Sequence, residues 1–184
     1  MTSLADEIFA IFGRRGSDAY FGERVSMTEH ALQAAHFAQQ DGAPPRLVLA
    51  ALLHDIGHLL EDVPADLADW TTDARHEEVG GRWLAERFGV EISGPVRLHV
   101  PAKRYLCATD PEYLTKLSSA SVVTLQLQGG QMSPEEISRF ETERFFDDAV
   151  RVRRWDDQGK VAGLTTPSLS EYRRLIDGLQ VQPG

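Results

Sequence analysis

The chain has 184 residues, of which 42% are hydrophobic and 26% charged, the composition of an ordinary globular protein with one core. Its formal net charge of −9 makes nucleic acid and anionic membranes poor partners. The single cysteine, Cys107, excludes an internal disulfide and fits the reducing cytoplasm; no long apolar stretch or basic leader predicts membrane insertion or export. We therefore expect one cytoplasmic domain spanning residues 1–184.

The N-terminal part predicts two amphipathic helices. The first covers residues 3–13 and is closed by Gly13. The second covers residues 26–40, where Ser26 and Glu29 have the spacing of a capping box. His30 shares a stripe of this helix with apolar residues, so we expect its side chain to point inward.

The next stretch, LAALLHDIGHLL over residues 49–60, is the strongest chemical signal in the chain. Its apolar run leaves no polar side and predicts a buried helix. On an α-helix, His54 and His58 share a face and Asp55 points about 100° away from His54, so this one segment can aim two imidazoles and a carboxylate into the same cavity. A buried charge without a partner costs several kcal/mol, and a bound metal ion removes that cost.

Two further helices each carry one histidine. Residues 73–88 place His76 in a first turn, after a predicted loop at residues 62–72, and the Gly80-Gly81 pair predicts close approach of the helix that carries metal ligands. The piece that begins at Pro95 carries His99 near its end, and Pro101 is expected to break it.

The C-terminal half is also predicted to be helical. Residues 118–128 are rich in β-branched side chains but isolated among helices, so we assign a helix with Ser121, Thr124 and Gln128 on one face, which is either solvated or functional. Ser133-Pro134 opens a helix, and others are expected over about residues 143–160 and 170–179. The predicted fold is all-α.

The candidate metal ligands are imidazoles and carboxylates on separate predicted elements: His30, His54, Asp55, His76, His99 and a late aspartate. Such a set without thiolate favours iron, manganese or zinc. Four imidazole ligands are more than a single metal ion bound by a His-Asp pair uses, and the Asp55 carboxylate can bridge two ions. We therefore infer a dinuclear site.

The chain resembles the HD-domain superfamily, and more narrowly the HD-domain diiron oxygenases of the PhnZ type, which cleave the carbon-phosphorus bond of 1-hydroxyphosphonates. The resemblance spans Tyr20 to Lys160 and is carried by YFGE, MTEHALQAAHFA, LAALLHDIGHL, HEEVG, LHVPAKRYL, SSASVVTLQLQGG and RRWDD. It implies an HD-type helical bundle with a metal-binding core over about residues 20–160.

The resemblance also implies a role for each matching residue. One iron would be held by His30, His54, Asp55 and Asp156, and the other by Asp55, His76 and His99. The preference for Asp156 over Asp157 rests on the motif alone. Tyr20, with Glu23 as partner, would occupy the second iron until substrate displaces both. The phosphonate would be held by His58 and Lys103, helped by Ser121, Thr124 and Gln128.

The implied cofactor is an Fe(II)/Fe(III) pair with O2 as co-substrate, and the products are phosphate and a carboxylate. All four electrons come from the substrate, so no external reductase is needed. The main alternative is a metal-dependent HD phosphohydrolase acting on a nucleotide or phosphate ester. A non-catalytic metal-dependent sensor is a third possibility, but the ligands at every motif position argue against it.

The group beyond C1 of the phosphonate is left open by the sequence. A 2-amino group, which gives glycine, fits a contact with Glu23. A trimethylammonium group, which gives glycine betaine, fits a cation-π contact with Tyr20, Phe21 or Tyr105. Hydroxymethylphosphonate, with hydrogen at this position, is the third candidate.

Overall fold

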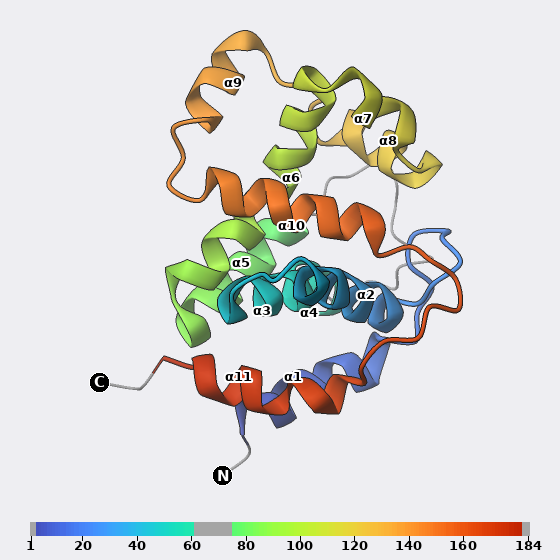
Figure 1. The fold of residues 1–184 in the computed structure, drawn as a ribbon, viewed down its shortest axis with the longest axis vertical. Coiled ribbons are helices and arrows are strands. Elements are labelled where there is room, and N and C mark those ends of the chain that lie inside the picture. The colour runs from blue at the N-terminus through green and yellow to red at the C-terminus, as the bar shows by residue number, and fades with distance from the viewer. Residues whose placement is uncertain (1–2, 61–74, 182–184) are drawn as a thin grey trace.

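The computed structural model describes residues 3–60 and 75–181, and in these ranges the regular elements are helices (Figure 1). They are α1 (Leu4–Arg15), α2 (Met27–Gln40), α3 (Pro45–Leu53), α4 (Ile56–Leu60), α5 (His76–Phe88), α6 (Val90–Thr109), α7 (Pro111–Lys116), α8 (Ser119–Leu127), α9 (Pro134–Phe140), α10 (Phe146–Gln158), a 3₁₀ turn η1 (Leu169–Tyr172) and α11 (Arg173–Leu179). The all-α prediction is confirmed. Across the described ranges, no helix is long and apolar enough to cross a membrane.

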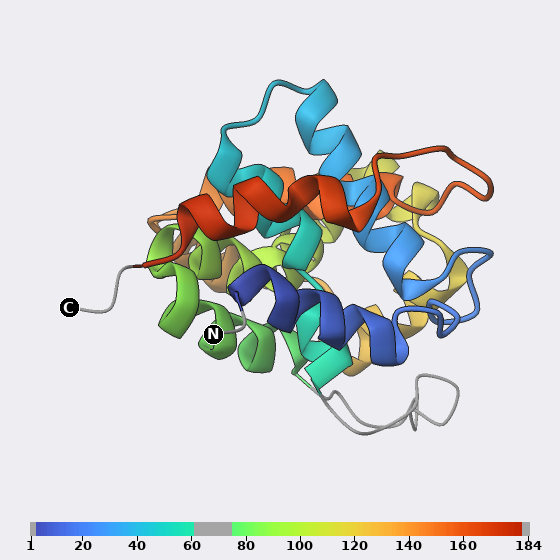
Figure 2. The same cartoon turned by 90° about the horizontal axis from the view of Figure 1, so that it is seen from below.

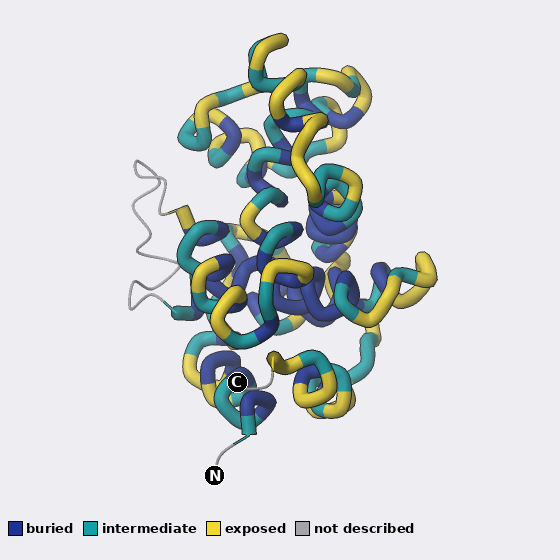
Figure 3. The backbone as a smooth tube through the Cα atoms, turned by 90° about the vertical axis from the view of Figure 1, so that its left-hand side faces the viewer, coloured by how far each residue is buried: buried dark blue, intermediate teal, exposed yellow. Residues whose placement is uncertain are grey.

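The helices pack around a central layer of α2, α3 and α4 (Figure 1). Helices α6 and α10 contact each other and this layer on one side, and α1 and α11 lie side by side on the other (Figure 2). The short helices α7, α8 and α9 lie at the end of the molecule far from both termini (Figure 1). Buried backbone is concentrated in the middle of the molecule (Figure 3). The site described below lies where α2–α6 and α10 meet.

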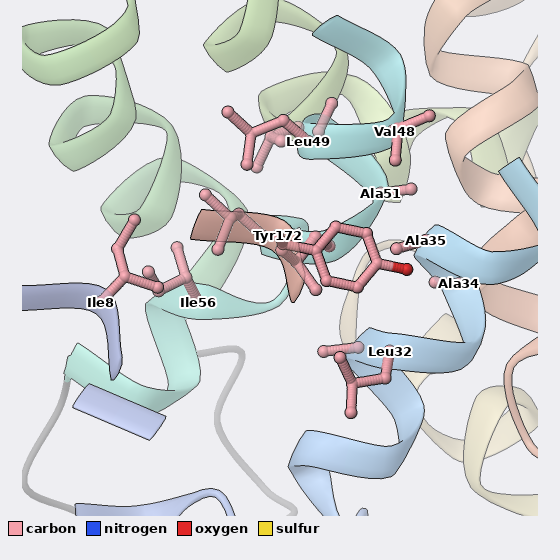
Figure 4. Packing of buried hydrophobic residues seen from close by; sticks show 14 of the residues in the cluster. Ile8, Leu32, Ala34, Ala35, Val48, Leu49, Ala51, Ile56 and Tyr172 are labelled. Carbon is pink, nitrogen blue, oxygen red and sulfur yellow. The ribbon is translucent and has the colours of Figure 1, made fainter. Parts of the chain in front are cut away.

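Helix α3 has no polar side, as its sequence predicts, and every residue from Leu47 to Leu53 is buried. Burial stabilises the fold by roughly 1.5–3 kcal/mol per large apolar side chain. Tyr172 belongs to the same buried cluster as Ala35 of α2 and Ala51 of α3, and its hydroxyl end points toward α2 (Figure 4). The segment that leads to His54 is therefore fixed on a tightly packed base.

Capping residues set the helix starts as their sequence pattern indicates. The Ser26 hydroxyl accepts from the Glu29 amide at 3.2 Å, while the Glu29 carboxylate accepts from the Ser26 amide at 2.7 Å. Ser133 forms the same capping box at the start of α9, where Pro134 is the first helical residue. The start of α2 fixes the register that turns His30 inward.

Gly13 does not end the first helix, contrary to the prediction. Helix α1 continues to Arg15, and the Gly16 amide closes it by donating to the Phe12 carbonyl at 2.6 Å. A glycine ends a helix most effectively when it adopts a left-handed conformation, and Gly13 instead keeps a helical one. Packing of Phe12 and its neighbours into the core outweighs the low helix propensity of glycine.

The prediction of one continuous helix through the His-Asp pair is wrong. Helix α3 ends at Leu53, α4 begins at Ile56, and His54-Asp55 form the turn between them. His54 and His58 therefore do not lie on one face of a continuous helix. His54 and Asp55 are both buried in this turn.

Pro101 does not break its helix either. Helix α6 runs without interruption from Val90 to Thr109 and contains both Pro95 and Pro101. Proline removes one backbone hydrogen bond, but α6 packs against α3, α5 and α10, and these contacts outweigh the loss. The continuous helix carries His99 and Lys103 on neighbouring turns.

The other helix bounds differ from the predictions by a few residues. Helix α5 begins at His76, while the predicted loop at 62–72 and the first residues of the predicted helix at 73–88 lie outside the described residues. Helix α10 covers Phe146–Gln158 inside the predicted 143–160. Helix α7, which the sequence interpretation did not assign, starts at Asp110-Pro111, an N-cap followed by a proline.

Candidate metal centre

Four imidazoles meet in two pairs inside the helical bundle. The Nε2 atoms of His30 and His54 lie 3.0 Å apart, and those of His76 and His99 lie 3.3 Å apart. All four side chains are buried. They come from α2, the turn after α3, the first residue of α5 and the middle of α6. The structure thus brings together imidazoles that the sequence places on separate elements.

Hydrogen bonds on the outer ring nitrogens turn these imidazoles inward. The Nδ1 atoms of His30, His54 and His99 donate to the carbonyls of Gly159, Ala51 and Val96, at 2.9, 2.8 and 2.6 Å. A ring whose Nδ1 carries the proton leaves its Nε2 lone pair free for a metal ion. His76 differs, because its Nδ1 lies 3.6 Å from a carboxylate oxygen of Glu77.

Asp55 lies between the two pairs and turns one oxygen to each. Its Oδ1 is 3.2 Å from His76 Nε2 and 3.6 Å from His99 Nε2. Its Oδ2 is 3.3 Å from His54 Nε2 and 3.5 Å from His30 Nε2. One ligand atom each from His30, His54 and Asp55 lie within 4.8 Å of one another, and the same holds for Asp55, His76 and His99. The carboxylate is placed to bridge two ions.

Asp156, and not Asp157, faces the imidazoles. Its Oδ1 lies 3.5 Å from His30 Nε2, and its Oδ2 accepts a 2.7 Å hydrogen bond from Arg153. Asp157 instead accepts hydrogen bonds from Arg153 and Tyr113. We call His30, His54, Asp55 and Asp156 the first ligand group, and Asp55, His76 and His99 the second ligand group.

The polar atoms of these groups fit cations. Asp55 Oδ2 and Asp156 Oδ1 are buried and have no hydrogen-bond partner among the described residues. Burial disfavours a charged imidazole, yet Asp55 and Asp156 raise the pKa of His54 to about 9. Burial likewise opposes ionisation of Asp55, but His54, His30 and His76 hold its pKa well below the usual value. The cluster stabilises positive charge, which a metal ion supplies.

Two glycines let the ligand-bearing elements approach each other. A Cβ atom on Gly57 of α4 would lie 2.0 Å from the His76 carbonyl oxygen, and one on Gly80 of α5 would lie 3.1 Å from the Gly57 amide nitrogen. Gly81 packs as closely on Arg97 of α6. The prediction that Gly80-Gly81 permits close approach of a ligand-bearing helix is confirmed, and the contact sets the position of His76.

Two lysines face the polar side of α8. Lys103 donates to the Thr124 hydroxyl at 2.9 Å, and Lys160 donates to the Ser121 hydroxyl at 3.1 Å. Lys160 also lies 3.7 Å from Asp156 Oδ1, so this cationic region adjoins the first ligand group. Burial, Arg153 and Lys160 lower the pKa of Lys103 to about 7, although Asp156 and Asp157 oppose the shift. The predicted polar face of α8 therefore meets a buried lysine, Lys103, and a half-buried one, Lys160, rather than solvent alone.

Comparison with known proteins assigns the family. The sequence matches the HD domain over residues 27–137. It is 43% identical to [1-hydroxy-2-(trimethylamino)ethyl]phosphonate dioxygenase (glycine-betaine-forming) of Leisingera caerulea over 174 residues, 95% of this chain and 89% of that protein. It is 46% identical to hydroxymethylphosphonate dioxygenase of Gimesia maris over 160 residues, 86% of this chain and 80% of that protein. The chain belongs to the HD-domain family. Its resemblance to the hydroxyphosphonate-cleaving members is confirmed.

In this HD-domain protein Tyr20 covers the first ligand group. Its ring stacks on His30 with centroids 3.8 Å apart and planes 18° from parallel. Burial, Asp156 and Asp55 raise the pKa of Tyr20 well above its usual value, so the hydroxyl stays protonated. The expectation that Tyr20 contacts the second iron remains a prediction, while the stacking here is on a ligand of the first group.

Glu23 follows Tyr20 across a tight turn. The Glu23 amide donates to the Tyr20 carbonyl at 2.7 Å, and Phe21 and Gly22 between them both have positive φ, at 42° and 78°. The turn points Phe21 toward His58, with ring centroids 4.7 Å apart. Phe21 and Glu23 line a pocket of about 490 Å³ whose opposite wall is the start of α8.

His58 lies outside the imidazole pairs of this HD-domain site. Its ring stacks on His76 with centroids 3.8 Å apart, and its backbone carbonyl accepts from Arg15 at 3.0 Å. Burial and the neighbouring His76 lower the pKa of His58 well below its usual value, so the ring is neutral at pH 7. His58 therefore contacts the second ligand group by stacking on its member His76.

The structure treats Gln128 and Tyr105, which were predicted to contact different parts of the substrate, differently. Gln128 has a buried side-chain oxygen with no hydrogen-bond partner among the described residues, which leaves it able to accept a hydrogen bond from a ligand. Tyr105 instead donates to Glu141 and packs on Phe140 and Phe146, away from the residues that line the pocket beside Glu23.

Sequence reasoning missed Lys160 as a site residue. The signal was available, because Lys160 lies four residues after Asp156, one helical turn if α10 had continued. The outer partners Gly159 and Arg153 were also missed. Gly159 is 129 residues from His30, and no local pattern announces such a contact.

Proposed function

We propose that the protein is an iron-dependent oxygenase that cleaves the carbon-phosphorus bond of a 1-hydroxyphosphonate with O2. The observation that carries this proposal is the position of Asp55, which turns one oxygen to each imidazole pair. A shared carboxylate between two sets of nitrogen donors suits a dinuclear centre. The two relatives act, by their names, on hydroxyphosphonates, and the family alone would not separate this chemistry from hydrolysis.

Two iron ions are the proposed cofactor. The first ligand group would hold one ion with three side chains of its own, and the second ligand group would hold the other with His76 and His99. Bound as an Fe(II)/Fe(III) pair, they would supply the redox chemistry that lets O2 oxidise the substrate. The remaining steps depend on how this chain holds and orients the phosphonate.

The reaction balances without an external reductase. A substrate R–CH(OH)–PO3H2 with one O2 gives R–COOH and H3PO4, so the substrate supplies all four electrons that reduce O2. The phosphonate leaves as phosphate after the C–P bond breaks, and C1 becomes the carboxyl carbon. The protein therefore needs sites for the phosphonate and the 1-hydroxyl group but no electron-transfer partner.

The two lysines provide the phosphonate site in this proposal. Lys103 and Lys160 offer ammonium groups, Thr124 and Ser121 supply the hydroxyls that they contact, and the unpartnered side-chain oxygen of Gln128 is proposed to face the same ligand. A dianion held there gains charge-assisted hydrogen bonds in a region from which water is largely excluded. This local charge explains how a protein of net charge −9 binds an anion.

The pocket beside the Tyr20 turn is proposed to receive the group beyond C1. Its lining includes the carboxylate of Glu23 and the ring of Phe21, which together suit a cation. We therefore favour a 2-amino-1-hydroxyethyl- or 2-trimethylammonio-1-hydroxyethylphosphonate over hydroxymethylphosphonate. The products would be glycine or glycine betaine.

The test is aerobic and anaerobic incubation of iron-loaded protein with each of the three phosphonates. We expect phosphate release from a cationic substrate with one O2 consumed per phosphate, and none without O2. A phosphohydrolase would release phosphate from a phosphate ester with or without O2. Equal phosphate release in the absence of O2 would refute the oxygenase assignment.

A further inference from the structure

The tripeptide Gly159–Val161, which follows α10, connects the first ligand group to the cationic region. Its first carbonyl, that of Gly159, accepts a 2.9 Å hydrogen bond from His30 Nδ1, which leaves Nε2 free to face the site. Its middle residue, Lys160, reaches Ser121 and Asp156. The position of this short segment therefore affects both a candidate iron ligand and a candidate phosphonate ligand.

Gln33 holds the far end of this segment with two hydrogen bonds. Its Nε2 donates to the Val161 carbonyl at 2.9 Å, and its Oε1 accepts from the Val161 amide at 2.9 Å. The Gln33 side chain is only 1% exposed, whereas Val161 is 48% exposed. The contact thus fixes the backbone of Val161 and makes no use of its side chain.

The near end of the segment lies directly on the backbone of α2. A Cβ atom on Gly159 would lie 3.1 Å from the His30 carbonyl oxygen, 3.2 Å from its Nδ1 and 3.3 Å from the Ala34 amide nitrogen. A larger residue would force the segment or α2 to shift. His30 and Gln33 are three residues apart on α2 and share one face. Both ends of the tripeptide are tied to that face.

We propose that Gln33 is a positioning residue that, by fixing Gly159–Val161, aims Lys160 at the bound phosphonate and keeps His30 turned toward its metal ion. The role of Lys160 in this inference rests on the proposed function. Gln33 touches neither the substrate nor the metal and acts only through the backbone it holds. A residue at position 33 that formed one hydrogen bond to Val161, or none, would hold the segment less firmly. The Lys160 ammonium group could then move to other positions on its flexible side chain.

A double-mutant cycle tests the proposal with iron-loaded protein and inorganic phosphate, the reaction product, as probe. The variants are Gln33→Met, Lys160→Ala and both together, with phosphate affinity measured by calorimetry. We expect Gln33→Met alone to weaken binding about tenfold and to add less than about twofold in the Lys160→Ala background. Gln40→Met is the matched control, because Gln40 is an exposed residue of α2 whose side chain, among the described residues, pairs with His36 on the same helix. It should leave the affinity unchanged.

The rate of iron release to a chelator is the second measurement. Gln33→Met should lose iron faster than wild type, roughly tenfold, as for other partners that orient a metal-ligating histidine. If Gln33→Met does not fold, Gly159→Ala replaces it, because it displaces the same segment, and the same cycle with Lys160→Ala applies.

These measurements separate the positioning role of Gln33 from the proposed function. An equal loss of phosphate affinity with and without Lys160 would overturn the positioning role, since Gln33 would then act independently of that lysine. A wild-type protein that binds no phosphate would contradict the proposed function, and the iron-release rate would then decide on Gln33. An unchanged rate in that case would overturn its positioning role as well.

Discussion

The two ligand groups differ in how firmly the protein holds them. The first ligand group has four donors, and three of them are fixed by hydrogen bonds: His30 donates to Gly159, His54 donates to Ala51, and Asp156 accepts from Arg153. The second ligand group has three donors, of which His99 donates to Val96, while His76 stands at the first residue of α5 with its Nδ1 3.6 Å from a Glu77 carboxylate oxygen. Fewer protein donors leave more coordination positions for substrate or O2. We infer that the first ligand group retains its metal ion firmly, whereas the second leaves coordination positions at which substrate or O2 can exchange.

The largest expected effect comes from the residue that both groups share. Asp55→Ala removes the only carboxylate of the second ligand group and one of two from the first. Iron content should fall to near zero, and turnover should fall by more than about a hundredfold, the upper end of what loss of an outer ligand partner costs. Elemental analysis and a phosphate-release assay measure both. Retention of two ions by Asp55→Ala would show that the carboxylate does not bridge.

A pair of histidine variants tests the difference between the groups directly. His76→Ala leaves two donors in the second ligand group, whereas His30→Ala leaves three in the first. We therefore expect His76→Ala to retain about one iron per chain and to lose the paramagnetic signal of a mixed-valent pair. His30→Ala should keep more iron under the same dialysis. The reverse order of iron loss would contradict the retention and exchange roles.

Arg153 supports the first ligand group through its hydrogen bond to Asp156, so its removal should weaken that group. Arg153→Met leaves the buried Asp156 carboxylate and the half-buried Asp157 carboxylate without their guanidinium partner, so the free energy of unfolding should fall by roughly 3–5 kcal/mol. Denaturant unfolding of the metal-free protein measures this without the contribution of bound iron. Arg154→Met, at an exposed neighbouring position of α10, should change stability by less than about 0.5 kcal/mol. Similar losses in both variants would show that the buried ion pairs are not the cause.

The same contrast explains which parts of the site could be predicted from the sequence. The ligands themselves were predictable, because histidine and aspartate are costly to bury inside apolar helices unless a metal ion or another charge compensates them. The Gly80 contact was predictable too, since paired glycines cost helix stability without a packing reason. The supports of the first group were not, because Gly159 and Gln33 act through backbone groups about 130 residues away in sequence.

The errors in the fold have a related cause. Local rules assigned a helix end to Gly13, a break to Pro101 and a continuous helix through His54-Asp55. In each case packing in the folded chain decided against the local preference: packing into the core keeps α1 helical past Gly13 and α6 helical past Pro101, and the buried His54-Asp55 turn separates α3 from α4. Fold class survives such errors because it depends on the apolar pattern summed over many residues.

The smallest expected effect concerns Lys103, which stands on α6 one turn after His99, a member of the second ligand group. Burial, Arg153 and Lys160 lower its pKa to about 7, so the ammonium form that attracts a phosphonate is lost as pH rises through 7. We expect kcat/KM to fall above pH 7, by at most about tenfold per pH unit, relative to a Lys103→Arg variant whose guanidinium stays charged. The ratio between the two proteins cancels the titration of the substrate. A ratio that is constant from pH 6 to about 8.5 would show that Lys103 binds the phosphonate in one charge state throughout, and the lower pKa would then have no part in the exchange of ligands at the second group.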